Sequence, residues 1–298
     1  MKIDLEEGIL NFIEKVKMTK TVLVEWNTPN TLNLDNFFEG ASALMKLDIA
    51  ALSIADNPLG IPRVSNALMG YKLSEQQIPV ILHLTTRDYN LVGLESKLMG
   101  LSAVGLNNLM IIKGDPTKIQ DATNVYDLTS KQLITTIKKM NQGISPSNRE
   151  LNSKLQFKVG GAFNINAVNL DLEFEDINRK IRSGVDYIIT QPVFDMINVK
   201  RLKDWITINE VAIPIFISVM PILSFERAQF IQDNVQGIKL PNEFMAVLKQ
   251  AALQNEERKV GIAASQNLIE SLSKVFNGVH IVTPGSDYQA IIEIMQGQ

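Results

Sequence analysis

Short apolar runs rich in β-branched residues recur along the chain and alternate with segments whose apolar residues fall at helical spacing. Most of the runs are almost continuously apolar, as expected for parallel strands that are covered on both faces. Their starts mostly lie about 30 residues apart, the length of one βαβ unit. Helical spacing is clearest over residues 33–47, 90–104 and 128–142. We therefore predict strands over residues 21–26, 49–56, 78–86, 108–115, 157–164, 186–194, 213–221 and 278–284.

The repeated strand–helix pattern, without a second block of different composition, predicts an α/β fold in which residues 1–298 form a single (β/α)8 TIM barrel. Residues 1–18 would form a helix that caps the barrel, and the long gap before the last strand leaves room for extra helices. The polar stretch 141–154 is expected to be a flexible loop. A doubly wound open sheet is the alternative, but it usually carries a glycine-rich turn after its first strand, and residues 25–30 contain no glycine.

Composition narrows the function classes. The chain has 29 basic and 32 acidic residues and a formal net charge of −3, so it lacks the basic excess typical of proteins that bind nucleic acid or anionic membranes. The absence of cysteine excludes disulfides and thiolate metal sites, and two histidines, His83 and His280, are too few for a histidine-rich site, so we predict no metal. Without a long apolar stretch or a signal-peptide pattern, a cytoplasmic enzyme is expected.

Polar residues stand at the carboxyl ends of the predicted strands, which is where the active site of such a barrel lies. Any one of them could simply cap a helix or belong to a polar loop. Their coincidence at so many strand ends instead indicates one polar mouth. The residues are Glu25, Asp56, Asn57, His83, Thr85, Arg87, Asp88, Lys113, Gly114, Asp115, Asn164, Asn166 and Gln191.

Glu25 interrupts an otherwise apolar strand, VLVEW. A carboxylate there would be partly removed from water, which raises its pKa and makes it a candidate general acid near neutral pH. The alternative is an ordinary ion pair with a nearby lysine or arginine. The residues alone leave both interpretations open.

Two further groups have weaker signals. The turn Lys113–Pro116 (KGDP) combines a glycine that allows close approach of a ligand with a lysine that could hold a phosphate and a carboxylate that could bind a planar edge, although the same residues are common in turns. Arg179 and Lys180 lie in a predicted helix, where a solvated helix face is the simpler interpretation.

The motifs, taken in order, resemble those of the methylenetetrahydrofolate reductase family. HLTTRDYN (83–90) is similar to the family pattern H-x-T-x-R-D-x-N, and NNLMIIKGDP (107–116) is similar to N-x-L-x-L-R-G-D-P. SGVDYIITQPVFD (183–195) and FISVMPILSF (216–225) resemble A-G-A-D-x-x-I-T-Q-x-x-F-D and G-I-M-P-I-x-x-F. Residues 55–66 and 160–171 look most like the reductase half of bifunctional homocysteine S-methyltransferase/methylenetetrahydrofolate reductase proteins. The methyltransferase half is not part of these 298 residues, so we expect either a fragment of such a protein or a reductase that stands alone.

The resemblance implies that FAD binds at the mouth of the barrel and passes hydride from NADH or NADPH to 5,10-methylenetetrahydrofolate, forming 5-methyltetrahydrofolate. It also implies a homo-oligomer and functional coupling to a homocysteine methyltransferase. Glu25 matches the general acid, Asp115 the carboxylate that binds the pterin and tunes the flavin, Gln191 a folate and nicotinamide contact, and Phe225 the ring that stacks on folate. The implied flavin contacts are Asp56, Asn57, His83, Lys113, Gly114, Asp115, Tyr126, Asp127, Asn164, Asp176, Arg179 and Lys180.

Some positions depart from the family pattern. Asn164-Ile165-Asn166 replaces Tyr-Pro-x-x-His after the fifth strand, Lys113 replaces an arginine, and Ala55-Asp56-Asn57 replaces Thr-Tyr-Gly. These changes affect the expected contacts to the flavin adenosine more than the chemistry. Two other functions are weighed: a flavin-free TIM-barrel enzyme acting on a phosphorylated substrate, and a non-catalytic barrel that partners a homocysteine methyltransferase.

Overall fold

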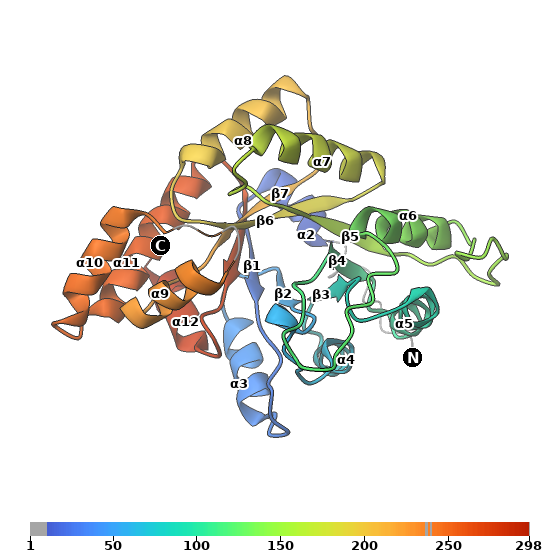
Figure 1. The fold of residues 1–298 in the computed structure, drawn as a ribbon, viewed down its shortest axis with the longest axis horizontal. Coiled ribbons are helices and arrows are strands. Elements are labelled where there is room, and N and C mark those ends of the chain that lie inside the picture. The colour runs from blue at the N-terminus through green and yellow to red at the C-terminus, as the bar shows by residue number, and fades with distance from the viewer. Residues whose placement is uncertain (1–10, 236–237, 239, 298) are drawn as a thin grey trace.

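The computed structural model describes residues 11–235, 238 and 240–297. Its strands form a closed parallel barrel in sequence order, β1 to β8, and β1 pairs with β8 from Thr21↔Gly278 to Glu25↔Val282. The predicted (β/α)8 barrel is therefore confirmed and the open doubly wound sheet is wrong (Figure 1). The strands are β1 Thr21–Glu25, β2 Ala51–Ile54, β3 Val80–Thr85, β4 Asn108–Ile112, β5 Lys158–Phe163, β6 Tyr187–Val193, β7 Ile215–Val219 and β8 Gly278–Val282.

Helices follow the strands and surround the barrel (Figure 1). The three segments with the clearest helical spacing form α3, α5 and α6. Three consecutive helices, α9 to α11, separate β7 from β8, which confirms the extra helices expected before the last strand. In the described ranges, no helix has the length and apolarity needed to cross a bilayer. The helices are α3 Asp35–Leu44, α4 Asn66–Glu75, α5 Leu91–Ala103, α6 Ser130–Asn141, α7 Leu170–Arg182, α8 Ile197–Ile208, α9 Phe225–Asn234, α10 Asn242–Ala252, α11 Glu257–Ser273 and α12 Tyr288–Gln296, with a short 3-10 turn at Pro58–Gly60.

A helix closes the amino-terminal end of the barrel, as predicted. Helix α2 spans Asn11–Met18, while residues 1–10 of the expected capping helix lie outside the described residues. Phe12 of α2 meets the ring of Tyr187 edge to face, with the centroids 5.1 Å apart. Ile13 and Val16 join the same cluster, which fills the lower barrel. Among the described residues, the amino-terminal end of the barrel is thus filled by side chains of α2 and the strands.

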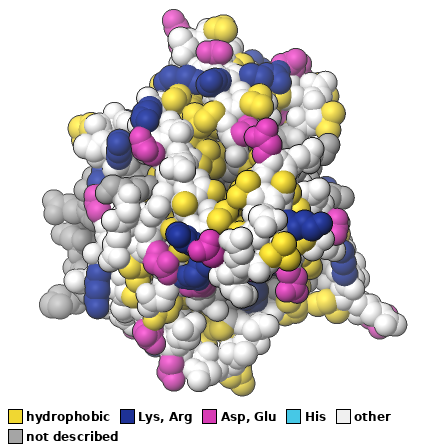
Figure 2. Space-filling view, turned by 90° about the vertical axis from the view of Figure 1, so that its left-hand side faces the viewer, with side chains coloured by type: hydrophobic (Ala, Val, Ile, Leu, Met, Phe, Trp, Pro, Cys, Tyr) yellow, Lys and Arg dark blue, Asp and Glu magenta, His cyan; other side chains and the backbone are white. Residues whose placement is uncertain are grey.

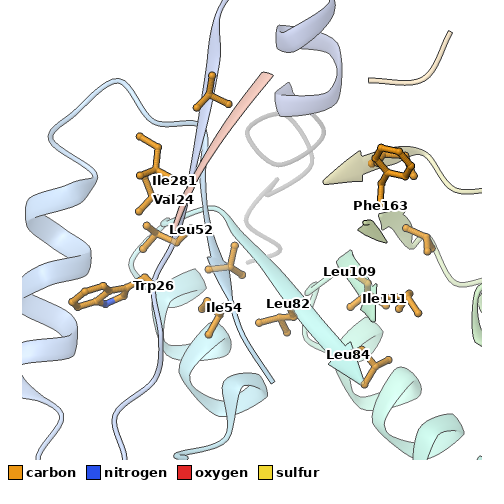
Figure 3. Packing of buried hydrophobic residues seen from close by; sticks show 14 of the residues in the cluster. Val24, Trp26, Leu52, Ile54, Leu82, Leu84, Leu109, Ile111, Phe163 and Ile281 are labelled. Carbon is orange, nitrogen blue, oxygen red and sulfur yellow. The ribbon is translucent and has the colours of Figure 1, made fainter. Parts of the chain in front are cut away.

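The alternation of side chains along each strand divides the core in two. Leu23 and Ile81 point into the barrel, where they pack with the α2 cluster. Val24, Leu52 and Leu82 point outward and pack beneath the helices (Figure 3). Both faces of the sheet are buried, which is why the strands read as continuous apolar runs.

The polar stretch 141–154 contains its own hydrogen bonds. Ile144 and Glu150 form an isolated antiparallel bridge, and the buried Ser145 hydroxyl accepts from the Arg149 backbone N–H at 3.1 Å. The expected flexibility of this loop stays a prediction. On the face drawn in Figure 2, basic side chains lie among acidic ones, and apolar side chains are scattered between them.

Candidate active site

A cleft of about 580 Å3 opens at the carboxyl-terminal mouth of the barrel. The loops after β1, β2, β7 and β8 form most of its walls, with part of α9. Of the residues predicted as site residues, it brings together Glu25 and Asp115, whose carboxylates are the acidic groups in its described lining. This pairing of two carboxylates in one cleft is the central feature of the site.

Glu25 is the last residue of β1 and lies on the same, inward-facing side of the strand as Leu23. Burial raises the pKa of its carboxyl to about 7, against the opposing effect of a hydrogen bond from Asn27 Nδ2 at 3.5 Å. Among the described residues, no lysine or arginine forms an ion pair with it. The general-acid interpretation therefore fits the geometry better than the ion-pair interpretation, because this carboxyl can hold and release a proton near neutral pH.

Asp115 lies in a turn that is fixed by backbone bonds. Gly114 has a φ of +82°, and a Cβ at this position would lie 3.0 Å from Thr85 Cγ2, so glycine suits both the conformation and the space. The Tyr126 hydroxyl donates to the Gly114 carbonyl at 2.9 Å, and the exposed Lys113 places its ammonium 5.4 Å from the centre of the Tyr126 ring. The backbone is held in this way while the exposed Asp115 carboxylate remains available to a ligand.

Arg87, one of the polar residues that the sequence places at the end of the third strand, holds the mouth together. Its side chain is 2% exposed and forms two hydrogen bonds to the Asp88 carboxylate, at 2.6 and 2.7 Å. It also donates to the carbonyls of Asn57, at 3.1 Å, and Asp115, at 2.9 Å. One guanidinium thus ties the loops after β2, β3 and β4 together. Its position at a strand end, within HLTTRDYN, was the signal in the sequence, and its bonds between the loops were not predicted.

Two of the predicted flavin contacts have protein partners below the mouth. His83 lies inside the barrel with its Nε2 2.7 Å from Ser53 Oγ, and burial lowers its pKa to about 4. Asp56 is 4% exposed and accepts from the Thr85 N–H at 3.1 Å, with Lys97 Nζ 3.6 Å away. Neither side chain lines the cleft.

The predicted contacts on α7 form an ion-pair cluster beside β5. Lys180 is 12% exposed, lies 2.8 Å from Asp176 and donates to the Ala162 carbonyl. Arg179 is 49% exposed and lies 3.5 Å from Asp176. Hydrogen bonds and charges from the neighbouring lysines lower the pKa of Asp176, although burial opposes them. The cluster is outside the walls of the cleft.

The remaining predicted residues surround the mouth without lining the cleft. The amide oxygen of Gln191 is buried without a hydrogen-bond partner in the described structure. Phe225 begins α9 and packs with the apolar cluster beneath that helix. Asp127 accepts from the Leu91 N–H at 2.9 Å, at the start of α5. Asn57 donates to Asp88, and Asn164 accepts from the Asn166 N–H.

Two arginines in the cleft lining were missed by sequence reasoning, Arg63 and Arg227. Arg63 belongs to the segment ADNPLGIPRVSN, which was read only as a family motif. No pattern of spacing distinguishes it from an ordinary loop arginine. No cluster of three or more His, Asp or Glu side chains suited to a metal ion occurs in the part of the chain that the structure describes.

Comparison with known proteins places this geometry in context. The sequence pattern of the family described as methylenetetrahydrofolate reductase matches residues 11–297. Methylenetetrahydrofolate reductase 1 of Schizosaccharomyces pombe is 22% identical over 187 residues, which cover 58% of this chain and 27% of that protein. The match thus spans about a quarter of the length of this curated relative.

Solved structures share the fold. An uncharacterized Clostridium thermocellum protein, described as binding two copies of 5-methyl-5,6,7,8-tetrahydrofolic acid, is 17% identical with a TM-score of 0.65, covering 98% of this chain and 96% of its own. EDTA monooxygenase from Chelativorans sp. BNC1 is 10% identical with a TM-score of 0.54, covering 93% of each chain. At these identities the likeness establishes the common barrel and nothing finer.

Proposed function

Because the chain belongs to the methylenetetrahydrofolate reductase family, we propose that it reduces 5,10-methylenetetrahydrofolate to 5-methyltetrahydrofolate with NADH or NADPH as the hydride source and FAD as the carrier. The observation that carries the proposal is Glu25 at the base of the cleft, with a pKa of about 7 and without a charged partner among the described residues. Opening the methylene bridge requires a proton on a folate nitrogen. A carboxyl that is half protonated near neutral pH can supply it.

The residues at the mouth fit a flavin nucleotide. The amide oxygen of Gln191 is buried and accepts no hydrogen bond in the described structure. An N–H group of a flat heterocycle could donate to it. Asp115 presents an exposed carboxylate from a rigid turn, and Lys113 and Arg179 are exposed cations that could neutralise a diphosphate. The fit is weaker for His83 and Asp56, whose side chains already have protein partners.

FAD, when bound, would supply hydride transfer between the nicotinamide and the folate. The chain's own residues would do the remaining work. Asp115 would accept hydrogen bonds from the pterin edge, Gln191 would orient the folate, and Phe225 would stack on the folate side chain. Glu25 would hold the proton until the pterin nitrogen is in place.

The comparisons support this proposal at a coarser level. The Clostridium thermocellum barrel is described as binding a folate that would be the product here. Riboflavin lyase with a modified FMN, at 9% identity and a TM-score of 0.52, is a flavin-associated protein with the same fold. Coupling to a homocysteine methyltransferase, assembly into a homo-oligomer and a cytoplasmic location belong to the same proposal.

The test begins with the purified chain mixed with FAD. We expect it to take up FAD and turn yellow, and the absorption should bleach anaerobically with NADH or NADPH. A protein that stays colourless with excess FAD would sink the flavin proposal.

Glu25→Gln separates the two half-reactions. The variant should still be reduced by the nicotinamide, but folate reduction should fall by about 10²- to 10⁴-fold, the usual contribution of a general acid. Glu150→Gln, in the exposed loop far from the cleft lining, is the matched control and should behave as wild type. Normal folate turnover by Glu25→Gln would remove the acid role from Glu25.

A further inference from the structure

Arg63 lines the cleft with most of its hydrogen-bonding capacity unused. A guanidinium has five N–H groups. In the described structure, Arg63 uses one in a side-chain hydrogen bond, from Nη1 to the Thr28 carbonyl at 2.8 Å. Its Nε–H is buried without a partner. Since buried polar groups in native proteins are almost always paired, this orphaned donor requires an explanation.

The charge of Arg63 is also unpaired. Across the described residues, no Asp or Glu forms an ion pair with it, and burial lowers its pKa because no counter-charge offsets the lost water. Arg87, in contrast, donates twice to a carboxylate in the neighbouring loop. An arginine that only served to hold the loop would be expected to have such a partner.

The backbone already holds the loop around Arg63. The Arg63 N–H donates to Asn57 Oδ1 at 3.0 Å, and the Val64 N–H donates to the Pro29 carbonyl at 2.9 Å. The first bond lies within the loop after β2, and the second joins that loop to the loop after β1 without the guanidinium. The side chain is therefore positioned at the wall of the cleft and is free to serve a ligand.

We propose that Arg63 binds the anionic end of the ligand whose flat ring lies between Glu25 and Asp115. This inference rests on the proposed function and names a subsite for it. The anionic end is a carboxylate or a phosphate, because the planar guanidinium can donate two hydrogen bonds to two oxygens of either group. Two ligands of the proposed reaction carry such an end: the folate, through its glutamate carboxylates, and the nicotinamide dinucleotide, through its phosphates. Arg227, an exposed arginine at the start of α9, provides a second cation in the same lining.

The experiment measures binding by titration calorimetry to the FAD-loaded protein after its flavin has been reduced with dithionite under anaerobic conditions. The reduced flavin can accept no hydride from the probes, so the readout does not depend on turnover. The probes are 5-methyltetrahydrofolate and NADH, with tetrahydropterin and reduced nicotinamide riboside as counterparts that lack the anionic end. Arg63→Gln removes the charge, and Arg63→Lys keeps the charge but loses the fork. Arg201→Gln, at an exposed arginine of α8, is the matched control.

We expect Arg63→Gln to weaken the binding of one of the two anionic probes by about 10- to 100-fold, because a charge-assisted hydrogen-bonded pair is lost. Arg63→Lys should have an intermediate affinity, and Arg201→Gln should bind as wild type. The probe that is weakened identifies the anion: the folate carboxylate or the dinucleotide phosphate. The tail-free counterpart should bind equally to all variants.

Equal weakening of the tail-free probes would overturn the proposal, because Arg63 would then act through the shape of the loop. Wild-type affinity of Arg63→Gln for both anionic probes would also overturn it and leave the proposed function standing. If the wild-type protein binds neither folate nor NADH, the proposed function itself fails.

Discussion

The two sides of the barrel mouth differ in whether their charged side chains have partners within the protein. Around the loops after β3 and β4, the protein supplies partners: Arg87 is bonded to Asp88 and to two loop carbonyls. On the side of the loops after β1 and β2, Glu25 and Arg63 face the cleft without a charged partner among the described residues. Because an unpaired buried charge is costly, it persists only where it has another use.

This difference separates structural charge from ligand-binding charge. Where a charged group has its partners, it fixes the loops that shape the mouth. Where a charged group has no partner in the protein, a ligand can supply one. The ligand-binding roles that we propose for Glu25 and Arg63 rest on this difference, whereas Arg87 bonds to the turn that carries Asp115.

The largest effect is expected from breaking the paired side. Arg87→Met should lower the free energy of unfolding by about 3 kcal/mol, because it leaves Asp88 without its partner and releases two loop carbonyls. Urea denaturation measures this loss. Arg87→Met combined with Asp88→Asn should recover part of the stability, since the unpaired charge is gone. A loss below about 0.5 kcal/mol, the range of ordinary surface substitutions, would contradict the structural role of the pair.

The unpaired side should respond to pH in the opposite sense to a paired carboxylate. The pKa of Glu25 is raised from 4.5 to about 7 in the folded protein. Below pH 4.5 the carboxyl is protonated in both states; as pH rises, the unfolded chain ionises first, so stability is lost until the folded pKa is passed. The loss at pH 8 is at most about 3 kcal/mol, and contact of this half-buried group with solvent reduces it.

Glu25→Gln should remove this penalty. We expect the variant to be more stable than wild type at pH 8 and equal to it at pH 4, as measured by urea denaturation at the two values. Glu150→Gln should show no pH-dependent difference. A gain of the same size at both pH values would mean that packing, not ionisation, separates the variant from wild type.

The sequence was sufficient for the barrel, and it pointed to Glu25 as an unusual carboxyl at the end of the first strand. Parallel strands buried on both faces give continuous apolar runs, so all strands were found within a few residues of their bounds. Glu25 was visible because a charge inside such a run is unusual. The interior position of His83 beside Ser53 follows from the strand register and was not anticipated, since it depends on which side chains meet across the barrel.

Arg63 and Arg87 could not be told apart by their sequence context. Each is an arginine near a proline or an aspartate in a polar loop. What distinguishes them is the presence of a carboxylate partner and of bonds between distant loops, which arise only when the barrel brings those loops together. For the same reason, the sequence could not decide whether Arg179 and Lys180 would be solvated, paired or free for a ligand.

The smallest expected effects concern that pair and test the comparison within one helix. Lys180 is 12% exposed and is bonded to Asp176 and the Ala162 carbonyl, so Lys180→Met should lower the free energy of unfolding by about 1 to 3 kcal/mol. Arg179 is 49% exposed, and Arg179→Gln should change stability by less than about 0.5 kcal/mol. If Arg179 serves the flavin diphosphate, the same substitution should still weaken FAD binding, measured by fluorescence quenching on titration. A flavin affinity that depends on Lys180 alone would show that a charge with protein partners can also bind the ligand. The presence of a protein partner would then not distinguish structural charges from ligand-binding charges on α7.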